Sequence, residues 1–225
     1  MQRGFSFGGH SFEVAGDAAL FWAAHKVLLV ADLHLEKASA FASGGQFLPP
    51  YDSLATLDEL SVLARGFGAR SIMCLGDNFH DDEGETRLDG AAANRLKMLT
   101  QTFDWHWITG NHDPGLAAKW GGETAREITL SGITLKHEAD PCESSPEISG
   151  HFHPKYRQQL RGRMVSRRCF VRTGRKLIMP AFGAFTGGMN AGDAAIASAC
   201  GIGAGEEIRA LVPTSRALVT FDLRA

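Results

Sequence analysis

Seven side chains of metal-binding types occur in five short clusters along the sequence, and each cluster directly follows a short apolar run. Two are carboxylates, one is an amide and four are imidazoles: Asp32, His34, Asp77, Asn111, His137, His151 and His153. Residues at the carboxyl ends of strands gather at one edge of an open α/β sheet. If the apolar runs are strands, the sequence predicts that all seven side chains meet at one polar site.

The types of these side chains indicate which metal ions would suit the site. Carboxylates, an amide and imidazoles without a thiolate favour Mn²⁺, Fe or Zn²⁺ over Ca²⁺ or Mg²⁺. Seven ligands exceed the needs of one ion, but they suit two ions about 3.5–4 Å apart that share a carboxylate, an arrangement used for in-line displacement at phosphorus. Two divalent ions, less two carboxylates and one bridging hydroxide, leave a formal charge of about +1. Such a site would attract a phosphate ester, which the bridging hydroxide would attack.

Each motif is weak alone, and only the ordered series is specific. A D-x-H or N-H-D pattern arises often by chance, so a structural role is the better interpretation of any single one. Five patterns in order, each after a predicted strand, favour a metal site instead. His80, three residues after Asp77, has two open interpretations: it could contact a bound phosphate, or it could only hydrogen-bond its own turn.

The elements that would position these residues follow from the apolar pattern. Short apolar runs between Gly-containing or polar turns predict strands at 27–31, 71–75, 105–109, 133–136, 147–149, 169–171, 177–179 and 218–221. Helical spacing predicts helices over 52–65, ending at Gly66, and over 85–100, with a short helix expected at 193–199. Strands that alternate with helices, followed by a run of strands, predict an α/β (α+β) fold, a mixed β-sandwich flanked by helices.

The chain is expected to form one domain over residues 1–225, because no linker, repeat or low-complexity tract divides it. Gly-Gly and Pro-Pro pairs predict a mobile loop over 39–50. No run has the length of a secretory signal core or a membrane span, so we expect a cytoplasmic protein without a membrane partner. The four cysteines are widely scattered, which argues against a disulfide framework or a thiolate metal site.

The net charge of −2 conceals a basic segment at 155–176. It contains nine basic residues and no Asp or Glu: Lys155, Arg157, Arg161, Arg163, Arg167, Arg168, Arg172, Arg175 and Lys176. A solvated face of β-hairpins is the plain interpretation of such a run. Because the segment starts two residues after His153, we favour contact with the phosphates of a nucleic acid, with Lys155, Arg157, Arg167 and Arg168 as candidate substrate-binding residues.

Four aromatic residues near these motifs could stack on unpaired bases: Tyr51, Tyr156, Phe182 and Phe185. The two phenylalanines lie in PAFGAFTGG, which alternates like a buried strand entering a Gly-Gly turn. For them we expect core packing rather than base stacking.

The ordered series DLH, GDNFHD, GNHD, KH and GHFH, from Asp32 to His153, resembles the calcineurin-like metallophosphoesterase superfamily. The resemblance implies a four-layer fold with a β-sandwich between helices. It implies that one metal is held by Asp32, His34, Asp77 and His153, and the other by Asp77, Asn111, His137 and His151. It also implies that His112 donates a proton to the leaving oxygen, with Asp113 orienting its ring; a carboxylate in that place would fix the imidazole tautomer.

Further motifs, ADLHLEK, LPPYDS, GHFHP and PAFGAFTGG, resemble the ligase-associated DNA-processing metallophosphoesterases, the PdeM group. That resemblance implies a Mn²⁺-dependent phosphodiesterase and single-strand DNA endonuclease in DNA repair, with a DNA ligase or helicase system as a partner. The alternatives are a phosphomonoesterase or nucleotide phosphodiesterase and, second, a non-catalytic binding scaffold. No metal ligand of the superfamily pattern is missing, which argues against the scaffold. Residues 191–225 carry no assignable motif.

Overall fold

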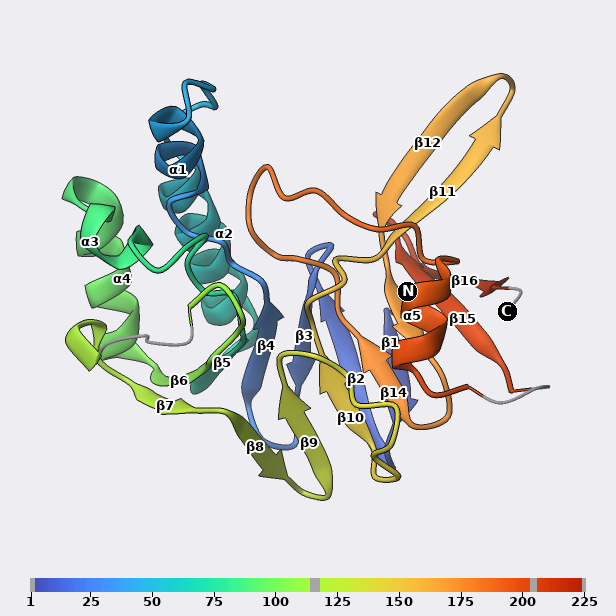
Figure 1. Cartoon of the computed structure of the whole chain (residues 1–225). Helices are drawn as coiled ribbons and strands as arrows, with labels where there is room; N and C mark the ends of the chain where they lie inside the picture. Colours follow the sequence, from blue (N-terminus) through green and yellow to red (C-terminus); the bar gives the residue numbers. More distant parts are fainter. Residues whose placement is uncertain (1–2, 114–117, 203–205, 224–225) are drawn as a thin grey trace.

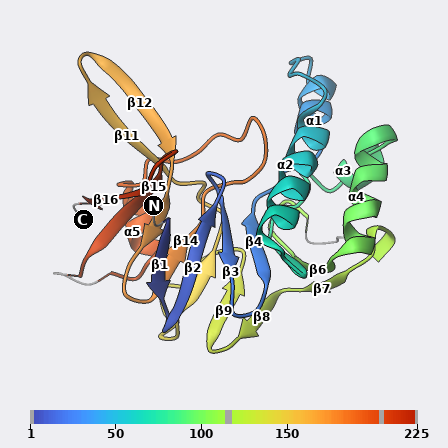
Figure 2. The same ribbon diagram turned by 180° about the vertical axis from the view of Figure 1, so that it is seen from behind.

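Two seven-stranded sheets stack face to face, and helices lie on the outer face of each (Figure 1, and from behind in Figure 2). The computed structural model describes residues 3–113, 118–202 and 206–223. The order is therefore helix, sheet, sheet, helix, the four-layer architecture that the sequence predicts.

The first sheet is mixed and follows the order of the chain. Its strands are β1 (Gly4–Phe7), β2 (His10–Ala15), β3 (Ala19–Trp22), β4 (Val27–Ala31), β5 (Ser71–Leu75), β6 (Asp104–Ile108) and β7 (Glu123–Ala125). Neighbours from β1 to β4 are antiparallel, whereas neighbours from β4 to β7 are parallel. The carboxyl ends of β4, β5 and β6 therefore lie at the same edge of the sheet.

The second sheet contains the later strands in a rearranged order. Across the sheet they are β16 (Leu218–Leu223), β15 (Ile208–Pro213), β13 (Phe170–Arg172), β14 (Lys176–Ile178), β10 (Glu147–Ser149), β9 (Ile133–Lys136) and β8 (Glu127–Leu130). β10 is parallel to both β9 and β14. Between β10 and β13 the chain leaves the sheet as an antiparallel hairpin, β11 (Lys155–Leu160) and β12 (Arg163–Arg168), which projects from the body of the protein (Figure 1).

The helices lie on both outer faces. α1 (Lys37–Ser43), α2 (Asp52–Phe67), α3 (Gly84–Arg87) and α4 (Gly90–Thr102) lie on the side of the first sheet, and α5 (Ala194–Ala199) lies on that of the second (Figure 1). A 3₁₀ turn covers Ala118–Trp120. Among the described residues, no helix combines the length and apolar character needed to span a membrane.

The apolar core explains why strand β4 is apolar at every position. Leu28 and Val30 pack in the cluster beneath α2 and α4, whereas Leu29 and Ala31 pack in the cluster between the two sheets. Alternate residues of a strand point to opposite faces, so a strand covered on both faces loses the polar–apolar alternation. All four side chains are fully buried, and burying a Val or Leu side chain stabilises the fold by about 1.5–3 kcal/mol.

Two helix predictions need correction. The helix predicted over 85–100 is broken into α3 and α4, because Leu88 and Asp89 are extended and Gly90 has a φ of 53°. The helix predicted to end at Gly66 continues to Phe67, and Gly68 is the residue that takes the left-handed conformation (φ 66°). The predicted loop over 39–50 overlaps α1 in its first half.

Candidate metal centre

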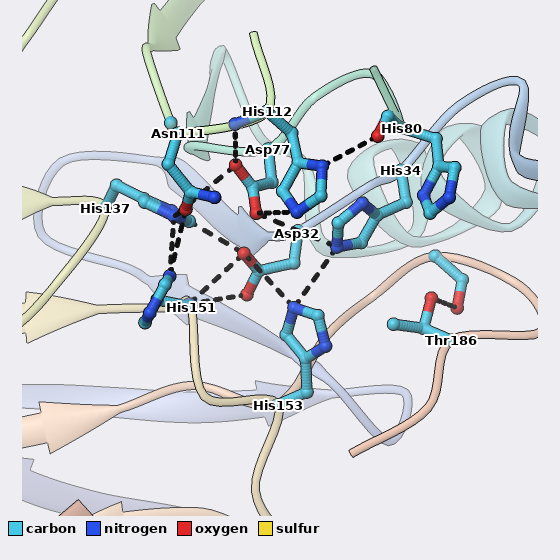
Figure 3. Close-up of polar contacts among 12 residues, drawn as sticks. Asp32, His34, Asp77, His80, Asn111, His112, His137, His151, His153 and Thr186 are labelled. Carbon is cyan, nitrogen blue, oxygen red and sulfur yellow. Dashed lines mark hydrogen bonds and ion pairs between the residues drawn. The ribbon is translucent and has the colours of Figure 1, made fainter. Parts of the chain in front are cut away.

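All seven predicted side chains converge at the edge formed by the strand ends of the two sheets (Figure 3). Asp32 and His34 follow β4, Asp77 follows β5, Asn111 follows β6, His137 follows β9, and His151 and His153 follow β10. Three of these segments belong to the first sheet and two to the second. The centre therefore spans both sheets.

The first group of donor atoms comes from Asp32, His34, Asp77 and His153, each of which offers one atom within 4.8 Å of all the others. The Nε2 atoms of His34 and His153 lie 3.2 Å apart. His153 Nε2 lies 3.5 Å from Asp32 Oδ1, and His34 Nε2 lies 3.9 Å from Asp77 Oδ2. Two carboxylate oxygens and two ring nitrogens thus face a common point.

The second group comes from Asp77, His137 and His151, again within 4.8 Å, with Asn111 beside them. Asn111 Oδ1 lies 2.8 Å from His137 Nε2 and 3.1 Å from His151 Nδ1. His137 Nε2 lies 3.4 Å from Asp77 Oδ1. Asp77 belongs to both groups, and its two carboxylate oxygens face different imidazoles.

The charge environment fits divalent cations. Asp32 and Asp77 are 0% and 2% exposed, and among the described residues neither has a Lys or Arg within ion-pair distance. Buried carboxylates require compensation by opposite charge, which bound metal ions supply. Burial, followed by the charge of His153, lowers the pKa of His34 to about 2, so this ring stays neutral, the form that binds metal.

Hydrogen bonds from the backbone hold several of these side chains in place. The His151 N–H donates to Asp32 Oδ2 at 2.9 Å, and the His112 N–H donates to Asp77 Oδ1 at 3.0 Å. His137 Nδ1 lies 3.3 Å from the carbonyl oxygen of Leu75, which favours the tautomer with a free Nε2. Such contacts orient ligands before a metal binds.

The backbone at the centre is conformationally unusual. Five of the seven residues have a positive φ: Asp32 (54°), His34 (44°), Asp77 (43°), His151 (71°) and His153 (48°). Left-handed conformations of residues other than Gly cost about 1–3 kcal/mol each and cluster at functional sites. The strained backbone at these five residues therefore accompanies side chains that point into the centre.

Three glycines before the candidate ligands allow the segments to approach closely. A Cβ on Gly76 would collide with the His137 ring, one on Gly110 with Asp77, and one on Gly150 with Asp32. The need for residues without a side chain at these positions is therefore steric.

His112 lies at the rim of the centre. Its Nε2 is 3.9 Å from Asp77 Oδ2, and its side chain is 42% exposed. Its Nδ1 lies 2.8 Å from the carbonyl oxygen of His80, so Nδ1 carries the proton and Nε2 faces the centre. The ring can accept or donate a proton there.

The expectation that Asp113 orients His112 is wrong in its geometry. Asp113 Oδ2 accepts hydrogen bonds from the N–H groups of Asn78 (2.7 Å) and Phe79 (3.2 Å), and Oδ1 accepts one from Gly110 (3.0 Å). Burial raises the pKa of Asp113, and these bonds oppose the rise. Asp113 therefore joins the loops after β5 and β6, while the carbonyl of His80 orients His112.

His80 and Lys37 extend the rim. The His80 ring stacks on His112 at 5.7 Å between centroids and lies 5.4 Å from His34; its Nδ1 is buried and has no partner among the described residues, so it does not bond its own turn. Lys37, which we did not predict, has its ammonium 5.6 Å from the centroid of Phe41, whose ring lies 5.6 Å from His80. Its place three residues after His34 was the signal available in the sequence.

The basic segment at 155–176 does not form one surface. Lys155, Arg157 and Arg168 donate to the carbonyl oxygens of Thr186, Gly188 and Gly183, respectively, and Arg167 is exposed on β12. Lys176, by contrast, is 2% exposed and its Nζ lies 2.5 Å from Glu147 Oε2, while Arg175 pairs with Glu206 at 3.7 Å. Arg175 is also exposed, but it lies between β13 and β14 rather than on the β11–β12 hairpin, which carries Lys155, Arg157, Arg167 and Arg168.

The four aromatic residues differ in environment. Phe182 is buried in the core, as expected, but Phe185 is 47% exposed, so the expectation of core packing is wrong for it. Tyr156 stacks on Phe221 with centroids 4.3 Å apart, which occupies one face of its ring. Tyr51 is 60% exposed.

Paired carboxylate and imidazole groups at the edge of a helix-flanked β-sandwich define a metal-dependent phosphoester hydrolase. Residues 25–160 match the calcineurin-like phosphoesterase family, and since they make up more than half of the chain, the protein belongs to that family. No curated protein sequence matches the chain significantly.

Among solved structures, the chain is similar to the nuclease MPE of Pseudomonas putida, with a TM-score of 0.70 and 27% identity over 93% of this chain and 96% of that one. It is also aligned with Yfce, a phosphoesterase from E. coli, with a TM-score of 0.43 and 14% identity over 88% of this chain and 99% of that one. The second likeness is too distant to support an inference.

Proposed function

We propose that the protein is a Mn²⁺-dependent phosphodiesterase that cleaves single-stranded DNA. The observation that carries the proposal is the position of Asp77, whose two oxygens face the two groups of donor atoms. Asp32, His34, Asp77 and His153 would hold one ion, and Asp77, Asn111, His137 and His151 the other. When bound, the ions supply positive charge for a phosphate and a water of lowered pKa.

The protein's own groups provide the remaining steps. His112 Nδ1 donates to the His80 carbonyl, and this bond holds the ring with Nε2 turned toward the metal centre. Protonated His112 would donate its Nε2 proton to the oxygen that leaves phosphorus, which matters most when that oxygen belongs to a poor leaving group such as a sugar hydroxyl. His80, stacked beside it, is placed to contact the same phosphate.

The substrate assignment depends on charge outside the metal centre. The cations at the base of the β11–β12 hairpin, Lys155, Arg157, Arg167 and Arg168, begin two residues after His153. A phosphodiester chain that passes over the centre would meet these cations next, whereas a small monoester would not reach them. The resemblance to a nuclease over 93% of the chain supports the same choice.

Mn²⁺ suits a donor set of carboxylate, amide and imidazole groups without a thiolate. A role in DNA repair, a ligase or helicase partner and a cytoplasmic location follow from the resemblance of the sequence to the ligase-associated group, and they form part of the proposal on that ground alone.

The test compares substrates on one preparation. The protein is stripped of metal, Mn²⁺ is added back, and circular single-stranded DNA is offered beside bis(nitrophenyl) phosphate and nitrophenyl phosphate. We expect Mn²⁺-dependent opening of the circle and faster hydrolysis of the diester than of the monoester. Intact circles with faster monoester hydrolysis would replace the proposal with a phosphomonoesterase, and metal binding without hydrolysis would indicate a binding scaffold.

A further inference from the structure

A polar pocket of about 350 Å³ lies at the base of the β11–β12 hairpin. Three of its lining side chains are cations on the hairpin, Lys155, Arg167 and Arg168, and Phe185 lines it from the segment that follows the second sheet's β14. None of the motifs of the metal centre accounts for this combination of cations and an aromatic ring.

The pocket has an excess of positive charge. Asp17 is its one acidic lining residue among those described, and Asp17 lies 3.7 Å from Arg3. Lys155 Nζ and Arg168 Nη2 each donate to one carbonyl oxygen, at 3.0 Å and 2.8 Å, which leaves further N–H groups on both. Closely spaced cations of this kind favour an anion such as a phosphate.

Phe185 is presented outward by a firmly held segment. Its φ of 55° is unusual for a bulky residue, and the residue is 47% exposed. The flanking residues are tied down, because Ala184 N donates to Thr56 Oγ1 at 3.0 Å and Thr186 Oγ1 donates to Gly183 O at 2.8 Å. An exposed aromatic ring on a fixed, strained backbone is suited to stack on a ligand.

Two short chain connections link lining residues of the pocket to candidate metal ligands. Gly183 N donates to the carbonyl oxygen of Asp32 at 3.2 Å, two residues before Phe185 in the chain. Lys155 follows His153 by two residues. Because two residues span at most about 7 Å, a polynucleotide with one phosphate at the metals can place a neighbouring nucleotide at the pocket.

We propose that this pocket binds the nucleotide next to the scissile phosphate, with its unpaired base stacked on Phe185 and its phosphate held by Lys155, Arg167 and Arg168. The inference rests on the proposed function and deepens it. A base in a duplex is already stacked and paired, so this pocket selects single strands.

The base platform is tested by binding of labelled oligothymidylate, followed by fluorescence anisotropy, to the Mn²⁺-loaded protein in a His112→Ala background that slows cleavage. Phe185→Ala should weaken binding by about 5- to 150-fold, the range for loss of one base–aromatic stack. Phe185→Trp should restore it. An oligomer of abasic sugar phosphates should bind Phe185→Ala and the parent equally. The control variant is Met98→Ala, which alters an exposed residue on α4; it should leave the affinity for both oligomers unchanged.

The phosphate contacts are tested separately. Arg167→Ala should weaken oligothymidylate and the abasic oligomer alike and reduce the slope of log Kd against log salt by about 0.7, the value for one phosphate of a single strand. Two results for Phe185→Ala would overturn the base platform. One is oligothymidylate binding equal to that of the parent protein, and the other is an equal loss of affinity for oligothymidylate and for the abasic oligomer. Because the readout is binding to a protein whose cleavage is slowed, and not cleavage itself, these results stand apart from the opening of circular DNA, on which the proposed function depends.

Discussion

His112 Nδ1 lies 2.8 Å from the carbonyl oxygen of His80, and this contact turns His112 Nε2 toward the metal centre. A neutral backbone carbonyl, rather than a carboxylate, therefore sets the tautomer of the ring. The role of His112 as a proton donor then rests on its position at the rim, with 42% of the side chain exposed.

His112→Ala should slow DNA cleavage by about 10²–10⁴-fold, the usual contribution of a general acid. Bis(nitrophenyl) phosphate has a good leaving group that needs little protonation, so its hydrolysis should fall much less. The measurement is kcat on both substrates at equal bound Mn²⁺. Equal losses on the two would contradict proton donation by His112.

Asp113→Ala should destabilise the protein by about 2–4 kcal/mol, because three backbone N–H groups lose a buried charged acceptor. Asp113→Asn keeps an acceptor oxygen and should destabilise the protein by less than Asp113→Ala does. Urea unfolding of the metal-free proteins measures both free energies. If Asp113→Ala left stability unchanged while altering the pH profile of hydrolysis, Asp113 would be acting on His112 after all.

Lys176→Met should lower the free energy of unfolding by about 3–5 kcal/mol, since it leaves Glu147 charged and buried without its closest partner. It should not alter the salt dependence of DNA binding. Arg167→Ala is the matched control, because Arg167 is exposed and its removal should leave stability nearly unchanged. A reduced salt slope in Lys176→Met would mean that the basic segment acts as one surface.

The cysteines should differ sharply in reactivity at pH 8. Burial raises the pKa of Cys169 and of Cys200 to about 12, and it raises the pKa of Cys74 well above its usual value. Their thiolates, the reactive form, are therefore scarce at pH 8, whereas Cys142 is exposed. Ellman's reagent should modify one thiol rapidly in the native protein and four in denaturant. Rapid reaction of a second native thiol would contradict the packing of the core.

The sequence predicted the convergence of the seven candidate ligands well, because each follows a strand and strand ends share an edge. It could not predict the partner of Asp113, since the contact depends on how the loops at 76–80 and 110–113 pack against each other. It could not show that the cations of residues 155–176 have different environments, because the segment crosses a hairpin and two strands of the second sheet, where Arg167 is exposed and Lys176 is buried against Glu147. Phe185 was misjudged because its apolar alternation resembles a strand, although the chain there forms no strand and Phe185 is 47% exposed.

The most direct test of the account is the metal content and activity of Asp77→Ala. The parent protein, stripped and reloaded, should bind two Mn²⁺ per chain by elemental analysis and hydrolyse bis(nitrophenyl) phosphate. Because Asp77 faces both groups of donor atoms, Asp77→Ala should lose hydrolysis and bind fewer than two ions while circular dichroism shows a folded protein. Two bound Mn²⁺ with substantial turnover in Asp77→Ala would contradict a shared carboxylate at the centre.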